Sequence, residues 1–150
     1  MRKEINNIHF HYLTDPFHFP NRKELKAFLQ KTAKAEKQSI DTINYIFCDD
    51  AYLLDINQQY LNHDTYTDII TFQLNPKGEV LLSDIYISVE RVKDNATTHN
   101  TTFTKELHRV IFHGLLHLCG YKDKTKKDQE EMRKQEERCL NSYFVPRGTK

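Results

Sequence analysis

Glycine and proline are scarce in this chain, with four of each among 150 residues. Because these residues interrupt helices and strands, their scarcity indicates that little of the chain is loop. No internal repeat, low-complexity stretch or Gly/Ser-rich linker divides the sequence. We therefore predict one compact domain over residues 1–150, a length that allows a real hydrophobic core.

Long hydrophobic runs are also missing. No stretch approaches the roughly 18 consecutive apolar residues that a membrane span needs. The N-terminal segment, MRKEINNIHFHYL, has neither the apolar core nor the small-residue cleavage site of a signal peptide. We expect a cytoplasmic protein without a membrane partner, and the sequence leaves its oligomeric state open.

Cysteines are few and widely separated. Cys48, Cys119 and Cys139 form no CxxC pair, and their number is odd. These features disfavour both a disulfide framework and a zinc site made of thiolates. The three residues are interpreted as small, mostly buried apolar side chains.

Net charge is small as well, at +1, so the chain as a whole is not a strong attractor of nucleic acid. Between residues 91 and 127, however, eight Lys or Arg residues face only three acids. A solvated loop explains this excess about as well as a functional patch does. If the patch is functional, its field favours a polyanionic substrate such as RNA.

The hydrophobic patterns predict nine elements in the order β-α-β-α-β-β-α-α-α. Alternating or β-branched segments predict strands over 5–12, 42–48, 68–72 and 79–88, and a turn over 75–78. Helical spacing and capping residues predict helices over 21–37, from 49 to about 60, over 89–96, over 104–118 with Thr104 as cap, and over 128–140. We expect an α+β fold, a mixed sheet with helices packed on it. The charges of 128–140 are interpreted as a solvated face.

The stretch FHGLLHLCGYKD, residues 112–123, places two histidines among leucines. On a helix, His113 and His117 lie one turn apart and point the same way. Leu107, Ile111 and Leu115 occupy the opposite stripe, so the helix is apolar nearly all round and is expected to be central. A lone buried histidine is usually satisfied by a hydrogen bond, but two at this spacing can converge on one metal ion.

A third ligand has to come from beyond the helix. Gly120 permits a reversal of the chain, after which Asp123 can face the histidines. The result, H-x3-H-x5-D, resembles the metzincin pattern H-E-x-x-H-x-x-G-x-x-H, with Gly114 in place of the catalytic Glu. His113, His117 and Asp123 are therefore predicted to bind one Zn²⁺ ion per chain, with a fourth position open to water. Nickel or another divalent ion is an alternative.

The core HGLLHLCGY also resembles the signature H-G-x-L-H-L-x-G-Y-D-H of the YbeY family, bacterial metal-dependent endoribonucleases. Two further segments are similar to strands of that family, YTDIITF at 66–72 and SDIYIS at 83–88. Met132, in a helix after the motif, also fits the family's usual arrangement. Asp123 stands where the family has its third histidine, and Ser83 where it has glycine. Leu61 stands where it commonly has an arginine thought to bind phosphate.

The resemblance implies a single-strand-specific endoribonuclease that matures ribosomal RNA, especially the 3′ end of the small-subunit RNA, and acts in ribosome quality control. Ribosomal RNA and the small subunit are the expected partners, with RNA held by the basic residues of 91–127. A zinc-activated water is expected to attack the phosphodiester. The alternatives are a non-catalytic ribosome-assembly factor with a structural metal and, disfavoured by Gly114, a metallopeptidase.

Six further polar residues are assigned expected roles. Asp84 is interpreted as structural or as a hydrogen-bond partner of a metal-binding histidine. Asp68 is expected to fix a turn or to bond to local backbone, with a substrate role as the alternative, and His108 is expected to pack or lie on the surface. His63, Lys122 and Arg109 are the candidates to replace the missing arginine, and no catalytic base is assigned.

Overall fold

The computed structural model describes residues 7–61, 67–76 and 80–148, with side chains up to residue 144. Its elements follow the predicted order. The strands are β1 (Ile8–Tyr12), β2 (Ile40–Cys48), β3 (Ile69–Gln73) and β4 (Leu81–Ser88), and the helices are α1 (Arg22–Ala35), α2 (Asp50–Leu61), α3 (Val89–Thr98), α4 (Phe103–Leu118) and α5 (Lys126–Gly148). Residues 77–78 of the predicted turn, and residue 79 at the start of the predicted strand, lie outside the described residues.

The four strands form one mixed sheet in the order β1-β2-β4-β3. β1 and β4 both run parallel to β2, whereas β3 runs antiparallel to β4 at the edge of the sheet. The helices connecting β1 to β2 and β2 to β4 supply the crossovers that parallel strands require. The predicted α+β fold with a mixed sheet is confirmed.

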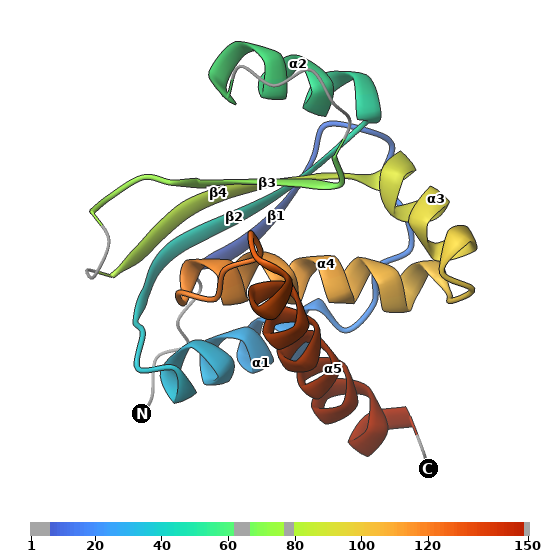
Figure 1. Ribbon diagram of the computed structural model, residues 1–150. Coiled ribbons are helices and arrows are strands. Elements are labelled where there is room, and N and C mark those ends of the chain that lie inside the picture. The colour runs from blue at the N-terminus through green and yellow to red at the C-terminus, as the bar shows by residue number, and fades with distance from the viewer. Residues whose placement is uncertain (1–6, 62–66, 77–79, 149–150) are drawn as a thin grey trace.

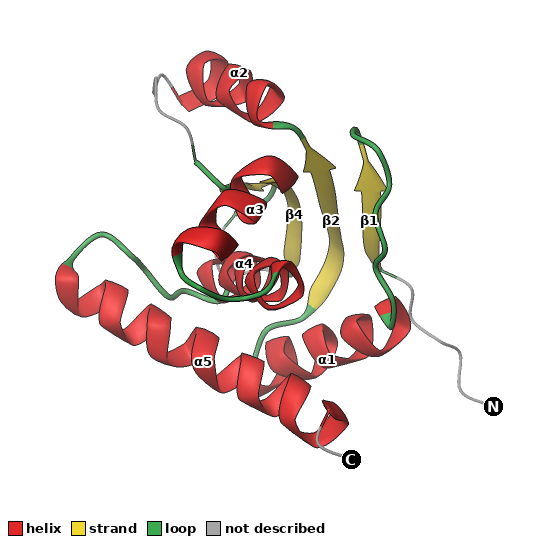
Figure 2. Ribbon diagram, turned by 90° about the vertical axis from the view of Figure 1, so that its right-hand side faces the viewer, coloured by secondary structure: helices red, strands yellow, loops and turns green. Residues whose placement is uncertain are grey.

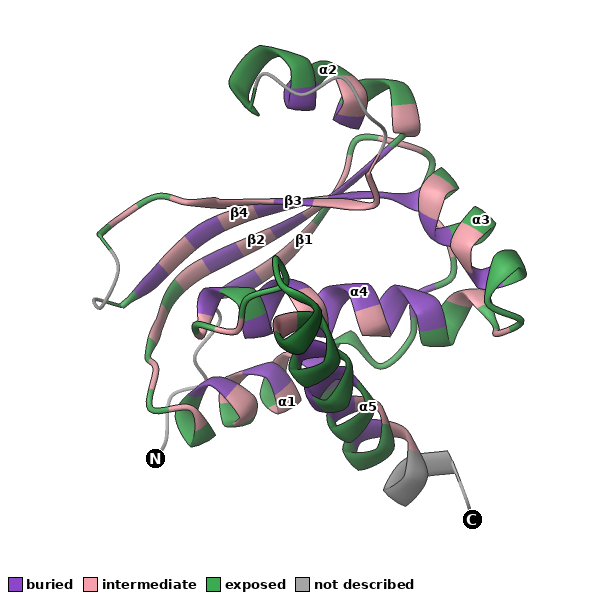
Figure 3. Cartoon of the chain, in the orientation of Figure 1, coloured by how far each residue is buried: buried purple, intermediate pink, exposed green. Residues whose placement is uncertain are grey.

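One face of the sheet carries α4, with α1 and α5 beyond it (Figures 1 and 2). β2 and β4 turn alternate side chains toward this face, including Ile43, Tyr45, Phe47, Ile85 and Ile87, all fully buried. Most of α4 is buried, as Figure 3 shows, so the prediction of a central helix is correct. Its stripe of Leu107, Ile111 and Leu115 belongs to the same core.

The opposite face of the sheet is covered by α2 (Figure 1). A smaller core lies between α2 and this face of the sheet, formed by Cys48, Leu53, Ile56 and Ile70. Asp49 caps the N-terminus of α2, as predicted, because its carboxylate accepts a hydrogen bond of 2.8 Å from the Tyr52 backbone N–H. This face also holds Asp84, whose carboxylate accepts a 3.1 Å hydrogen bond from the Asn44 amide.

The ends of α4 and α5 differ from the prediction. The cap of α4 is Thr102, not Thr104, because the Thr102 hydroxyl accepts the hydrogen bond from the Lys105 N–H. α5 begins at Lys126 and runs to Gly148, well beyond the predicted end at 140. Within the described residues, no helix is long and apolar enough to cross a membrane.

Candidate metal and RNA site

The two histidines of the motif lie in the last two turns of α4, on its one partly open side. His113 is half-buried and His117 is exposed, whereas the residues between them are buried. α4 ends at Leu118, and Gly120 follows with a φ of 110°, a conformation that favours glycine. The Tyr121 N–H then donates to the Leu116 carbonyl, which closes the reversal predicted from the sequence.

His113 lies between two carboxylates, one on each ring nitrogen. Its Nδ1 is 2.6 Å from Oε2 of Glu136, on α5. Its Nε2 is 3.5 Å from Oδ2 of Asp123, in the turn after α4. A carboxylate accepts hydrogen bonds, so Glu136 holds the ring proton on Nδ1 and leaves the Nε2 lone pair facing Asp123.

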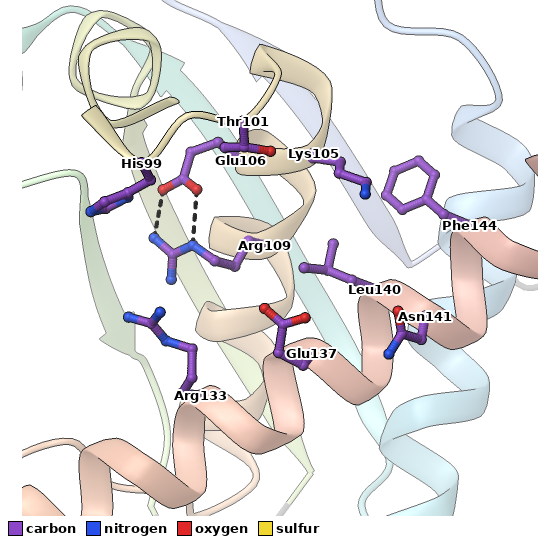
Figure 4. A pocket seen from close by; sticks show the side chains of 10 residues that line it. All are labelled: His99, Thr101, Lys105, Glu106, Arg109, Arg133, Glu137, Leu140, Asn141 and Phe144. Carbon is purple, nitrogen blue, oxygen red and sulfur yellow. Dashed lines mark hydrogen bonds and ion pairs between the residues drawn. The ribbon is translucent and has the colours of Figure 1, made fainter. Parts of the chain in front are cut away.

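Glu136 is itself held from behind by Arg109. The Arg109 Nη1 donates to Oε1 of Glu136 at 3.0 Å, and its Nε and Nη2 donate to the two oxygens of Glu106 at 3.1 and 2.7 Å. Figure 4 shows this paired contact between Arg109 and Glu106. Both carboxylates are almost fully buried, with side-chain exposures of 2% for Glu136 and 3% for Glu106.

The contact between Glu136 and His113 shifts the pKa of both side chains. Burial disfavours the charged form of Glu136, but the hydrogen bond with His113 and the charge of Arg109 outweigh it and lower its pKa. Burial likewise disfavours the charged imidazolium of His113, yet the hydrogen bond and charge of Glu136 outweigh it and raise the pKa of the ring.

A cavity of about 470 Å³ opens in front of the histidines. It is walled by α4, β3 and the end of α2, and all three predicted ligands line it. The full lining is Asn57, Leu61, Thr67, Asp68, Ile69, Ile70, Thr71, His113, His117 and Asp123. The fold therefore brings His113, His117 and Asp123 to one concave site from a helix and the turn that follows it. Leu61, where the family commonly has arginine, also borders this cavity.

The donor chemistry of the site fits a divalent metal only in part. Two ligands of one tetrahedral zinc ion lie roughly 3.3 Å apart when each is about 2.0 Å from the metal. The 3.5 Å between His113 Nε2 and Asp123 Oδ2 is close to that value. Nevertheless, no group of three or more His, Cys, Asp or Glu side chains within the described parts of the chain already has the arrangement of a metal site. Metal binding by these residues stays a prediction.

Asp68 and Asp84 have different surroundings. Asp68 lines the cavity, lies 3.7 Å from Arg109 and accepts a 3.4 Å hydrogen bond from the Asn95 amide. Burial raises the pKa of Asp68, although Arg109 and His113 partly offset it. Asp84 does not contact a histidine of α4, because strand alternation turns it to the face bearing α2, beside Asn44. Of its two predicted roles, only the structural one fits.

The other candidates separate into buried and exposed groups. His108 packs, as predicted: it is buried, its Nδ1 is 2.7 Å from the Thr104 carbonyl, and its ring contacts Tyr143 and Phe144. Arg109 borders a different cavity, of about 260 Å³, between α4 and α5 (Figure 4), and is already paired with acids. It is therefore a poor replacement for the missing arginine. Lys122 is exposed, and His63 lies outside the described residues.

The basic segment 91–127 does not act as one patch. Arg91 forms a 2.6 Å ion pair with Asp50, and Arg109 is paired as described. The lysines on either side of Asp123 are exposed: Lys122, Lys124, Lys126 and Lys127. Lys93 and Lys105 are exposed as well, so the exposed cations of the segment are spread over several elements, and four of them lie beside the candidate site.

Glu136 is the site residue that sequence reasoning missed. The interpretation of 128–140 as a solvated face is wrong for one stripe of α5, formed by the buried residues Met132, Gln135, Glu136, Cys139 and Tyr143. These positions have helical spacing, and a single acid within such a stripe is the signal that identifies a buried carboxylate.

Comparison with known proteins identifies the family of the chain. The family model described as "Endoribonuclease YbeY" matches residues 8–144. The chain belongs to the YbeY family. The Endoribonuclease YbeY of Christiangramia forsetii is 46% identical over 95% of this chain and 98% of its own length. That of Cytophaga hutchinsonii is 52% identical over 80% of this chain and 84% of its own length.

A solved structure shares the fold of this chain. The solution structure of TM1509 from Thermotoga maritima matches 93% of this chain and 90% of its own, with a TM-score of 0.64 and 28% identity. The family match begins at β1 and ends near the C-terminal end of α5, so it includes both the sheet and the helix that carries Glu136. The family resemblance inferred from the motif is confirmed.

Proposed function

We propose that this chain is a metal-dependent endoribonuclease that cleaves single-stranded ribosomal RNA in the cytoplasm, near the 3′ end of the small-subunit RNA. Membership of the YbeY family supports cleavage of RNA. The observation that carries the metal dependence is the cavity lined by His113, His117 and Asp123, in which Nε2 of His113 lies 3.5 Å from Oδ2 of Asp123. Zinc is the proposed ion, one per chain, and ribosome quality control is the proposed cellular role.

Each part of the cavity has a chemical task in this proposal. His113, His117 and Asp123 would hold the ion, which when bound supplies Lewis-acid activation of water and of a phosphoryl oxygen. The exposed lysines at 122, 124, 126 and 127 attract the phosphate backbone toward this end of α4. A concave site of this size suits a single strand better than a duplex.

The packing of Gly114 argues against a metallopeptidase. In the metzincin pattern this position carries the glutamate that acts as base. Here a Cβ at Gly114 would lie 3.1 Å from Cδ1 of Ile69 and 3.2 Å from Cδ1 of Ile85. A side chain at this position would require Ile69 and Ile85 to shift, and the glutamate that the mechanism needs is replaced by glycine.

The test is cleavage of a ribosomal RNA fragment that contains the 3′ end of the small-subunit RNA. We expect wild-type protein to cleave it, a chelator to abolish cleavage and added Zn²⁺ to restore it. His117→Ala should reduce cleavage to background. His99→Ala, which changes an exposed histidine just after α3, is the matched control and should cleave like wild type.

Metal analysis of the same preparations completes the test. Wild-type protein should carry close to one equivalent of zinc, and His113→Ala should carry much less. Cleavage that survives both the chelator and His117→Ala contradicts the proposal and indicates a contaminating nuclease. Specific RNA binding without any cleavage favours the alternative of a non-catalytic assembly factor, for which Leu61 at the cavity wall is the supporting feature.

A further inference from the structure

Glu136 occupies an unusual place for a carboxylate, buried between a guanidinium and an imidazole. Its side chain is 2% exposed, and each of its oxygens has a different partner. Oε1 accepts from Arg109 at 3.0 Å, and Oε2 accepts from Nδ1 of His113 at 2.6 Å. Because Arg109 is fixed in turn by both oxygens of Glu106, the carboxylate of Glu136 has little freedom to rotate.

We propose that Glu136 is a positioning residue that fixes the ring orientation and the tautomer of His113, so that Nε2 presents its lone pair to a metal ion in the cavity. This inference rests on the proposed function, because it assigns His113 as a ligand. Histidine ligands generally donate their second ring N–H to a carboxylate or carbonyl, which orients the ring and strengthens it as a donor.

The charge balance of the buried network supports this role. Glu106, Arg109 and Glu136 together carry one surplus negative charge, and both carboxylates are almost fully buried. A buried ionic network of this kind contributes little to stability in itself, since the cost of desolvation offsets its attraction. The surplus charge favours a cation on the far side of His113, where Asp123 adds a second carboxylate.

Replacement of Glu136 by glutamine gives a sharp chemical prediction. Glutamine has one acceptor oxygen, and Arg109 cannot accept a hydrogen bond, so that oxygen turns toward Arg109. The amide NH₂ then faces Nδ1 of His113, which has to accept the hydrogen bond. The ring proton moves to Nε2, the nitrogen that the metal requires unprotonated.

The experiment combines metal titration with an NMR measurement of the tautomer. Zn²⁺ binding by calorimetry should weaken roughly 10–100-fold in Glu136→Gln. Glu137→Gln, which changes an exposed carboxylate one position along the same helix, is the matched control and should bind like wild type. Long-range ¹⁵N–¹H correlation at alkaline pH, in the metal-free proteins, should place the His113 proton on Nδ1 in wild type and on Nε2 in Glu136→Gln.

The two measurements separate the failure of this inference from failure of the proposed function. Wild-type protein that binds no Zn²⁺ contradicts the metal-dependent function, while the tautomer still tests the role of Glu136. Equal Zn²⁺ affinity in wild type and in folded Glu136→Gln overturns the positioning role. A wild-type spectrum with the His113 proton on Nε2 also overturns it, whether or not the variant folds.

Discussion

The two carboxylates on His113 differ in almost every respect. Glu136, behind the ring, is 2% exposed, lies 2.6 Å from Nδ1 and is fixed by Arg109. Asp123, in front of the ring, is 47% exposed, lies 3.5 Å from Nε2 and projects from an exposed turn. The rear of the site is therefore preorganised, whereas its front retains freedom to adjust.

This difference indicates how the work of the site is divided. A rigid rear fixes the direction of the His113 lone pair before any ion arrives, which reduces the cost of ordering it on binding. The exposed front leaves Asp123 and His117 accessible to an ion or to substrate. Variants on the two sides should accordingly have different effects on stability, and the predictions below compare them.

The largest effect is expected from Glu136→Ala, which removes the buried carboxylate and leaves Arg109 and His113 without it. The loss of an ion-pair partner from a buried network costs about 3 kcal/mol. Because the pKa of Glu136 is lowered by folding, its contribution is present above the usual carboxyl range and is lost as pH falls through the folded-state pKa. Urea unfolding of the metal-free proteins should show the full difference in unfolding free energy between wild type and Glu136→Ala at neutral pH. The difference should be smaller in acid. Glu137→Ala should remain within about 0.5 kcal/mol of wild type.

An intermediate effect is expected from Gly120→Ala, which changes the turn that carries the front of the site. A Cβ there meets nothing within 4 Å, so the cost is conformational and arises from the φ of 110°. Residues other than glycine in such conformations cost about 1–3 kcal/mol. We expect a thermal unfolding midpoint below that of wild type and weaker Zn²⁺ binding, because the turn directs Asp123. Unchanged stability would mean that the turn adopts another conformation.

The smallest effect on stability is expected from Asp123→Ala. This side chain is half exposed and has only a long contact with His113, and surface changes of this kind are usually within about 0.5 kcal/mol. The same variant should lose Zn²⁺ affinity, while Asp123→His, which restores the family's residue, should retain it. If Asp123→Ala unfolded as easily as Glu136→Ala, the contrast between front and rear would be wrong.

The fold was largely predictable because its signals are local. Alternation in Ile8–Tyr12 and Ile40–Cys48, and helical spacing in α4, each depend on neighbours within a few residues. The cap of α4 was misplaced because Thr101, Thr102 and Thr104 all have a suitable hydroxyl, and only the backbone geometry selects Thr102.

The front of the site was predictable for the same reason, and the rear was not. His113, His117, Gly120 and Asp123 lie within eleven consecutive residues, so their juxtaposition follows from one helix and one turn. Glu136 reaches His113 only because α5 packs across α4, and its pairing with Arg109 spans 27 positions. The strong charge of α5 in the sequence concealed the buried stripe that makes this contact.

The contact between α5 and α4 also determines when the site can form during biosynthesis. All four strands of the sheet, the helices α1 to α4 and both motif histidines precede α5 in the chain, so they leave the translating ribosome first. His113 is therefore synthesised before Glu136, the carboxylate that contacts its Nδ1. The ring of His113 is therefore fixed last, once α5 has been synthesised and has packed across α4.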